Sequence, residues 1–169
     1  MTAIRPNPKR VLAIDPTSRG FGFVVMESPS TLIDWGVKSV APKEVSTILK
    51  KVSQLIRLYR PEALILEDPK HSRRCRRVQN LLAQMGELAC PEGLKHRFIS
   101  NSRIRKVFLT FGAVTKHQIA HVIAKQVPEL APRLPRYRKP WMSEDYRMSI
   151  FDATALTLCY LYSYATINP

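Results

Sequence analysis

The pattern of hydrophobic and polar positions begins with three short runs that predict β-strands. These runs cover residues 10–15, 20–27 and 31–40 and are rich in Val, Ile, Phe and Trp. The segments between them, PTSRG and SPS, have the composition of tight turns. We therefore expect an antiparallel meander at the start of the chain.

A helical pattern follows the meander. Apolar residues recur every three or four positions from Val45 to Tyr59, as on one face of an amphipathic helix, and Pro61 ends the pattern. The next run, EALILED at 62–68, is short and apolar, which is typical of a buried strand in a parallel pair. We expect it to lie parallel to the first strand.

The second half of the chain predicts mainly helices. They are expected at 78–89, 103–111 and 116–127, with a short strand at 96–100. Thr115 is a candidate cap for the third of these helices.

The last part of the chain combines a proline-rich segment with a final helix. Four prolines in residues 128–142 exclude a regular helix, so we expect a basic, semi-rigid connector there. Ser143, followed by two acids, is the expected start of a last helix that runs through Tyr164.

This order of elements predicts one α/β domain over residues 1–169. The sheet should be mixed and five-stranded, with its first three strands antiparallel and helices on both faces. Ligands of such sheets bind beyond the carboxyl ends of the parallel strands.

The amino-acid composition indicates a binding partner. The chain has 27 Lys and Arg against 13 Asp and Glu, a formal net charge of +14, which favours a polyanion such as nucleic acid. The basic residues form three clusters: Lys70, Arg73, Arg74, Arg76 and Arg77; Arg103, Arg105 and Lys106; and Arg133, Arg136, Arg138 and Lys139.

Other compositional features narrow the class further. No apolar run approaches the roughly 18 residues of a membrane span, and the N-terminal sequence lacks the apolar segment of a secretory signal, so we expect a cytoplasmic protein without a membrane partner. Three widely spaced cysteines, Cys75, Cys90 and Cys159, support neither a disulfide framework nor a zinc knuckle.

Three acids stand where a metal site could form. Asp15 ends the first predicted strand and Glu67 ends the fourth, so neighbouring parallel strands would bring their side chains together. Asp68 should face the other way. Asp152 lies in the apolar last helix, where an uncompensated charge is costly. Carboxylate oxygens are the ligands that Mg²⁺ prefers.

Four motifs in order resemble one family of nucleases. VLAIDPTSRGFGFVV, LILED, GAVTKHQIAHVI and FDATALTL are similar to motifs of the RuvC-like Holliday-junction resolvases, members of the RNase H-like superfamily, and the resemblance covers most of residues 10–163. It implies an RNase H-like fold and two Mg²⁺ or Mn²⁺ ions held by Asp15, Glu67 and Asp152. It also implies a basic catalytic residue at Lys116 and a second basic residue at Arg105 or its neighbour Lys106.

The resemblance further implies an activity. It indicates a Mg²⁺-dependent crossover-junction endodeoxyribonuclease that cleaves branched DNA by two-metal phosphodiester hydrolysis, acts in recombination and repair as a homodimer, and uses no nucleotide cofactor. Because the basic loop follows Glu67 closely, it is expected to contact DNA phosphates. The predicted DNA-binding residues are Lys70, Arg73, Arg74, Arg76, Arg77, Arg105 and Lys106.

One departure from the family keeps an alternative open. RuvC-like enzymes usually carry an Asp or His one turn before the last-helix acid, and this chain has Ser149 there, with Asp145 one turn further back. A non-catalytic or degenerate branched-DNA-binding protein is therefore the alternative. The substrate also stays open among Holliday junctions, other branched DNA and RNA–DNA hybrids.

Further interpretations receive less support from the sequence. An actin-like or sugar-kinase ATPase would need a second glycine-rich phosphate turn, which is missing. His117 and His121 have the spacing of a zinc protease motif, but Gln118 replaces its Glu. Tyr137 and Trp141 are expected to be packing anchors, with base-stacking platforms as the alternative.

Overall fold

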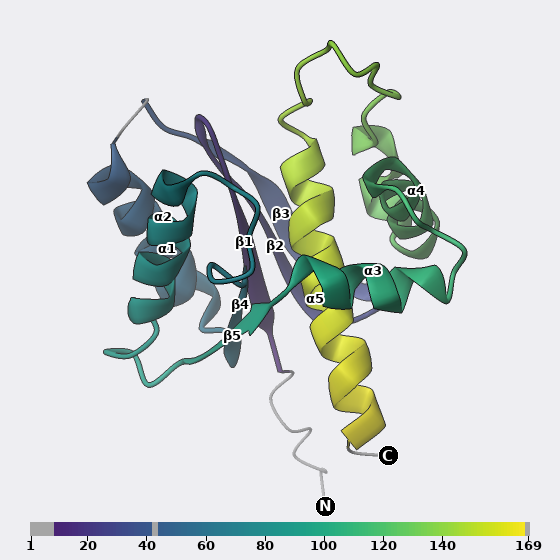
Figure 1. Ribbon diagram of the computed structural model, residues 1–169. Coiled ribbons are helices and arrows are strands. Elements are labelled where there is room, and N and C mark those ends of the chain that lie inside the picture. The colour runs from purple at the N-terminus through teal and green to yellow at the C-terminus, as the bar shows by residue number, and fades with distance from the viewer. Residues whose placement is uncertain (1–8, 42–43, 168–169) are drawn as a thin grey trace, which may run out of the picture.

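The strands form one mixed sheet, as the sequence predicted. The computed structural model describes residues 9–41 and 44–167. Within these residues the strand order is β3-β2-β1-β4-β5 (Figure 1). The first three strands pair antiparallel, whereas β4 is parallel to β1 and β5 is parallel to β4. The bounds are β1 Val11–Thr17, β2 Gly20–Ser28, β3 Thr31–Ser39, β4 Ala63–Glu67 and β5 Lys95–Ile99.

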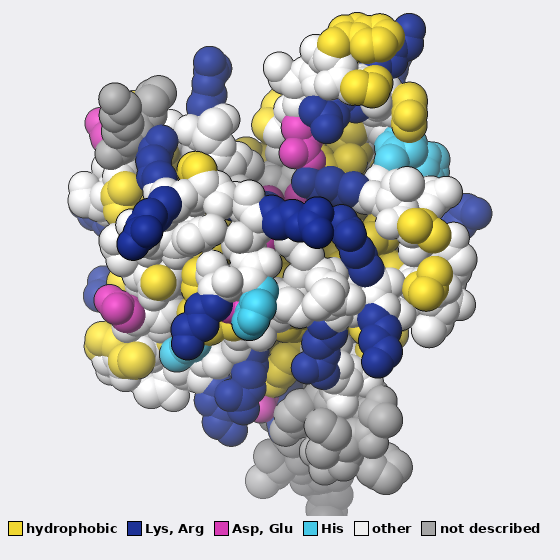
Figure 2. Space-filling view, in the orientation of Figure 1, with side chains coloured by type: hydrophobic (Ala, Val, Ile, Leu, Met, Phe, Trp, Pro, Cys, Tyr) yellow, Lys and Arg dark blue, Asp and Glu magenta, His cyan; other side chains and the backbone are white. Residues whose placement is uncertain are grey.

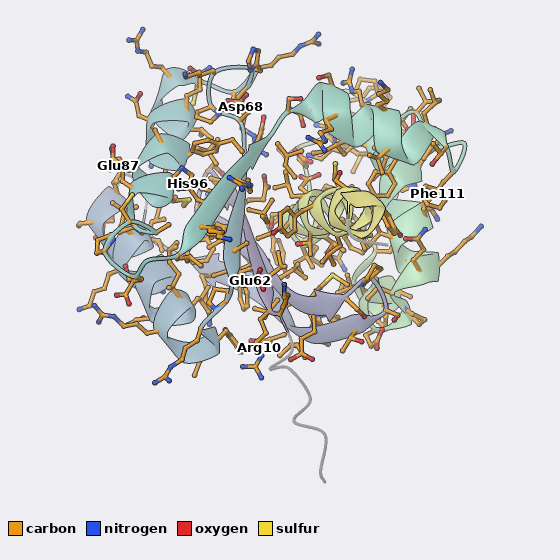
Figure 3. The ribbon with its side chains drawn as sticks, turned by 90° about the horizontal axis from the view of Figure 1, so that it is seen from below. Arg10, Glu62, Asp68, Glu87, His96 and Phe111 are labelled. Carbon is orange, nitrogen blue, oxygen red and sulfur yellow. The ribbon has the colours of Figure 1, made fainter. Side chains whose placement is uncertain are left out.

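Helices cover both faces of this sheet (Figure 3). On one face lie α1 (Val45–Tyr59) and α2 (Arg76–Glu87), and on the other lies α5 (Met148–Ile167), with α3 (Asn101–Leu109) and α4 (Lys116–Gln126) beyond it. Strand alternation produces two cores: Leu12 and Ile14 pack toward α1 and α2, whereas Val11 and Ala13 pack toward α5. None of the described helices is long and apolar enough to cross a membrane.

Helix α5 approaches the sheet closely at one glycine. A Cβ atom on Gly22 would lie 2.3 Å from Ser149 Oγ and 2.6 Å from the Ser149 carbonyl carbon, so only glycine lets the two backbones come this close. Gly22 is the β2 partner of Asp15 in β1. The contact therefore fixes the start of α5 beside the strand position that carries Asp15.

Two predictions near the C-terminus need correction. The last helix begins at Met148 rather than Ser143, because the Asp145 carboxylate accepts hydrogen bonds from the Arg147 backbone N–H and guanidinium and closes a turn there. The predicted connector is not wholly irregular either. Residues Pro128–Arg133 form a short 3₁₀ helix, η1, with a proline in its first turn, where a missing N–H is tolerated.

Candidate active site

Asp15, Glu67 and Asp152 line one pocket of about 230 Å³. The register Val11 to Ala63 and Ala13 to Ile65, continued along the strands, sets Asp15 of β1 level with Glu67 of β4. Helix α5 packs against both strands and brings Asp152 to the same place. The structure thus brings together the three acids that the sequence singled out.

Arg74 bridges the two acids of the sheet. Its Nη2 lies 2.5 Å from Asp15 Oδ1, its Nε lies 2.8 Å from Glu67 Oε2, and its Nη1 donates to the Pro16 carbonyl at 2.5 Å. Asp15 and Glu67 are only 3% and 4% exposed. Two buried carboxylates therefore share one guanidinium, which offsets part of the cost of their burial.

Glu67 has two further partners, neither of which was predicted. Ser72 Oγ and Asn101 Nδ2 each donate to Glu67 Oε1 at 2.8 Å. Asn101 is the first residue of α3 and lies two positions after β5, at the carboxyl end of a parallel strand beside β4. That position is itself a sequence signal, because polar residues there reach the ligand-binding edge of the sheet.

Lys116 binds the third acid from the first residue of α4. Its Nζ lies 2.8 Å from Asp152 Oδ2 and also contacts Glu144. Thr115 caps the helix through a complete capping box with Gln118, as the sequence suggested for Thr115. Glu144 was expected in the first turn of the last helix, and the structure instead places it in the loop before α5, where it pairs with Lys116.

Comparison with known proteins identifies the fold. No protein-family model matches the sequence, and no curated protein matches it significantly. Among solved structures, RuvC of T. thermophilus in complex with a Holliday junction substrate has a TM-score of 0.68 and 17% identity, over 95% of this chain and 97% of that one. Another Thermus thermophilus RuvC structure has a TM-score of 0.67 and 17% identity, over 93% and 96%. The chain has the fold of RuvC.

Within this RuvC fold, the surroundings raise the pKa of Asp15, Asp152 and Lys116. Burial, and next the Asp152 carboxylate, raise the pKa of Asp15 to about 8, against the opposing effect of Arg74 and Lys116. Burial also raises the pKa of Asp152, although Lys116 opposes it. Burial alone would lower the pKa of Lys116, but its contacts with Asp152 and Glu144 raise it above the ordinary value.

The site fits a divalent cation in its ligands but not in its present arrangement. Asp15, Glu67 and Asp152 supply the carboxylate oxygens that hard cations prefer. Asp15 and Glu67 are also buried, where a nearby cation favours the charged form of a carboxylate. In the described parts of the chain, however, no three His, Cys, Asp or Glu side chains are arranged to hold a metal ion. Arg74 fills the place between Asp15 and Glu67, so a metal would have to displace its guanidinium.

A larger groove of about 1140 Å³ opens beside the acids and also contains Asp15, Lys116 and Asp152. Arg73 and Arg77 line this groove. Figure 2 shows Lys and Arg side chains running across this face of the molecule, with acidic side chains close to them.

The predicted DNA-binding residues differ in their surroundings. Most of these predicted residues have exposed side chains, namely Lys70, Arg73, Arg76, Arg77, Arg105 and Lys106. Arg105 also lines the acid pocket. Arg74 differs from all of these, because it is bound to the acids rather than open to solvent.

The remaining residues singled out from the sequence lie outside the acid pocket. Asp68 accepts hydrogen bonds from His71 and the Lys70 backbone N–H, and it does not line the pocket that contains Glu67. Tyr137 and Trp141 are 72% and 78% exposed, so the expectation that they anchor the packing is wrong. Their ring contacts are with His117, at 5.4 Å from the Tyr137 ring, and with the Lys139 ammonium, at 5.3 Å from the Trp141 ring.

Proposed function

We propose that this protein is a metal-dependent, structure-selective endodeoxyribonuclease that cleaves branched DNA such as Holliday junctions. The observation that carries the proposal is the convergence of Asp15, Glu67 and Asp152 on one pocket at the base of a basic groove. The shared fold adds support, since one of the similar structures is a RuvC bound to a Holliday junction substrate.

The chemistry needs cations that the three acids would hold. Bound Mg²⁺ or Mn²⁺ would supply an activated water and stabilise the leaving 3′ oxygen of a phosphodiester. The protein's own contribution is to orient the ligands. Ser72 and Asn101 fix one oxygen of Glu67, and the close contact of Gly22 with Ser149 positions the helix that carries Asp152.

Lys116 has a role of its own in this mechanism. Its ammonium lies at the N-terminus of α4, beside Asp152, and the charged form is favoured there. A cation and a helix N-terminus together attract a phosphate and stabilise the negative charge that develops on it during hydrolysis.

The substrate class follows from the groove. Its basic residues can contact phosphates of the DNA backbone, which select shape more than sequence. Resolution of a four-way junction needs two symmetric cuts, so we propose a two-fold homodimer with two sites facing one junction. The biological setting that fits this activity is DNA recombination and repair.

A second candidate function is a branched-DNA-binding protein without cleavage. Two observations favour it. Arg74 already forms ion pairs with both Asp15 and Glu67. Ser149 stands in place of a further acid, and its hydroxyl donates to the Tyr146 carbonyl at 2.6 Å. This candidate keeps the basic groove and gives up the metal chemistry.

One variant tests the first candidate against the second. Asp15→Asn should abolish cleavage of a four-way junction in Mg²⁺ or Mn²⁺ but leave junction binding in EDTA intact, because it removes a metal ligand and no phosphate contact. Glu87→Gln, an exposed acid at the end of α2, is the matched control and should cut like the wild type. Junction, fork, RNA–DNA hybrid and linear duplex are compared as substrates.

The outcomes separate the two candidates. Cleavage by Asp15→Asn at the wild-type rate refutes the proposed site. Tight junction binding with no cleavage of any substrate by the wild-type protein establishes the second candidate instead.

A further inference from the structure

Arg74 occupies the position at which a metal ion would meet Asp15 and Glu67. Three of its guanidinium nitrogens are engaged, by Asp15, Glu67 and the Pro16 carbonyl, at 2.5 to 2.8 Å. Its side chain is 27% exposed and lines both the acid pocket and the larger groove. A guanidinium is a monovalent substitute for the cation that these carboxylates require.

We propose that Arg74 excludes metal from the free protein and is drawn away by DNA phosphate, so that the metal site forms only on the substrate. This inference rests on the proposed nuclease function and deepens it. It makes Arg74 a specificity-determining residue, because it links metal binding to the presence of DNA.

The two cations cannot share the site. A divalent ion bound to Asp15 and Glu67 would use the carboxylate oxygens that the Arg74 Nη2 and Nε atoms now contact. The positive charges would also repel each other at that distance in a buried, weakly screened environment. Metal binding in the free protein therefore requires both ion pairs to break.

A phosphate offers Arg74 an alternative partner. Arginine binds phosphate as well as carboxylate through paired, charge-assisted hydrogen bonds. Arg74 lines the same groove as Arg73 and Arg77, where the DNA backbone is proposed to lie. The Arg74 guanidinium could therefore exchange its two carboxylate partners for a DNA phosphate by a local movement.

The loop that carries Arg74 is built so that its side chain can move alone. Arg74 lies between β4 and α2, outside any helix or strand. Gln79 Nε2 of α2 donates to the carbonyls of Ser72 and Arg74 at 3.1 and 2.9 Å and holds the backbone. Rotation of the side chain toward the groove would leave these bonds in place.

Coupling of this kind is reciprocal. If DNA raises the affinity of the site for metal, metal must raise the affinity for DNA by the same factor. Removal of Arg74 should weaken this coupling, because metal could then bind to the free protein without breaking the Arg74 ion pairs.

The test measures metal binding without cleavage. Mn²⁺ binding to the free, full-length protein is followed by electron paramagnetic resonance for the wild type, Arg74→Gln, Arg74→Lys and Arg19→Gln. Arg19 is exposed at the same groove and controls for loss of one positive charge. Arg74→Lys keeps the charge but cannot bridge two carboxylates, and it serves if Arg74→Gln fails to fold.

The second arm measures DNA affinity. The dissociation constant of a four-way junction is compared in Ca²⁺ and in EDTA for the wild type and both Arg74 variants. We expect Arg74→Gln to bind Mn²⁺ roughly ten- to a hundredfold more tightly than the wild type, the usual span of such couplings. Arg74→Lys should lie between them, Arg19→Gln should match the wild type, and the gain in junction affinity from Ca²⁺ should be largest in the wild type.

Two results overturn the inference, and they are distinguishable. If both Arg74 variants bind Mn²⁺ no better than the wild type, Arg74 does not exclude metal, although the nuclease proposal stands. If no protein binds Mn²⁺ and Ca²⁺ leaves junction affinity unchanged in all of them, the metal site fails, and the nuclease proposal fails with it.

Discussion

Asp15 shows how a single buried carboxylate links stability to pH. Burial and the nearby Asp152 raise its pKa to about 8 from an ordinary value of 3.8. The folded protein therefore binds this proton more strongly than the unfolded chain does. By linkage, the stability that this proton contributes is fully present below pH 3.8 and is lost as the pH rises through about 8.

We therefore predict that the metal-free protein loses stability between about pH 4 and pH 8 through this group. Unfolding in urea, with EDTA present, is measured at several pH values in that window for the wild type and Asp15→Asn. The variant has no proton to release at this position, so its free energy of unfolding should fall less steeply. Asp152 has a raised pKa as well, so some slope should remain. Equal slopes for the two proteins would contradict the prediction.

Individual site residues differed in how far the sequence could reveal them. Asp15 and Glu67 could be predicted because each stands at the end of an apolar strand. Asp152 could be predicted because a charge in an apolar helix is costly unless another group compensates it. The contacts of Arg74 with Asp15 and Glu67 could not be predicted from the sequence, because they depend on the conformation of an irregular loop. Glu144 was missed for a related reason, since the helix expected to contain it begins only at Met148.

At the scale of elements, the contact between β2 and α5 controls where Asp152 lies. We predict that Gly22→Ala destabilises the protein by about 1–3 kcal/mol, the usual cost of overpacking, because its new Cβ would meet Ser149 at 2.3 Å. Part of that contact is backbone, which cannot rotate away, so α5 must shift. Junction cleavage should fall by more than the loss of folded protein explains.

Gly36→Ala in β3 is the matched control for this prediction. Its Cβ would meet only the Phe23 ring, at 3.2 Å, and a side chain can adjust by that amount. Urea unfolding and cleavage assays on both variants provide the comparison. An equal loss of activity in the two would show that the position of α5 does not limit the reaction.

The elements themselves were largely predictable because local patterns specify them. The meander, the alternation after it and the pairing of β4 with β1 followed from apolar runs and turn residues. The exceptions were governed by side-chain hydrogen bonds and by proline geometry. Asp145 binds Arg147 and delays the last helix, and prolines that exclude an α-helix still permit the 3₁₀ turn of η1.

At the scale of the whole molecule, the net charge of +14 matters by its location. Basic side chains line the groove, and others lie on α1, which covers the face of the sheet opposite α5. Only those that contact phosphate should influence the salt dependence of DNA binding, since each contact releases condensed counterions. Two variants of equal net charge that lose basic residues at different places can therefore show where the DNA binds.

We predict that replacing Arg73, Arg76 and Arg77 by Gln weakens junction binding and lowers the slope of log affinity against log salt by about 1 for each phosphate that the variant no longer binds. The control replaces Lys50, Arg57 and Arg60, exposed on α1 and at its C-terminal end, by Gln and has the same net charge. Fluorescence anisotropy from low to moderate salt measures both. The control should keep the wild-type slope, because these three residues do not line the groove. If the two triple variants have the same slope, the DNA does not lie in the groove beside the three acids.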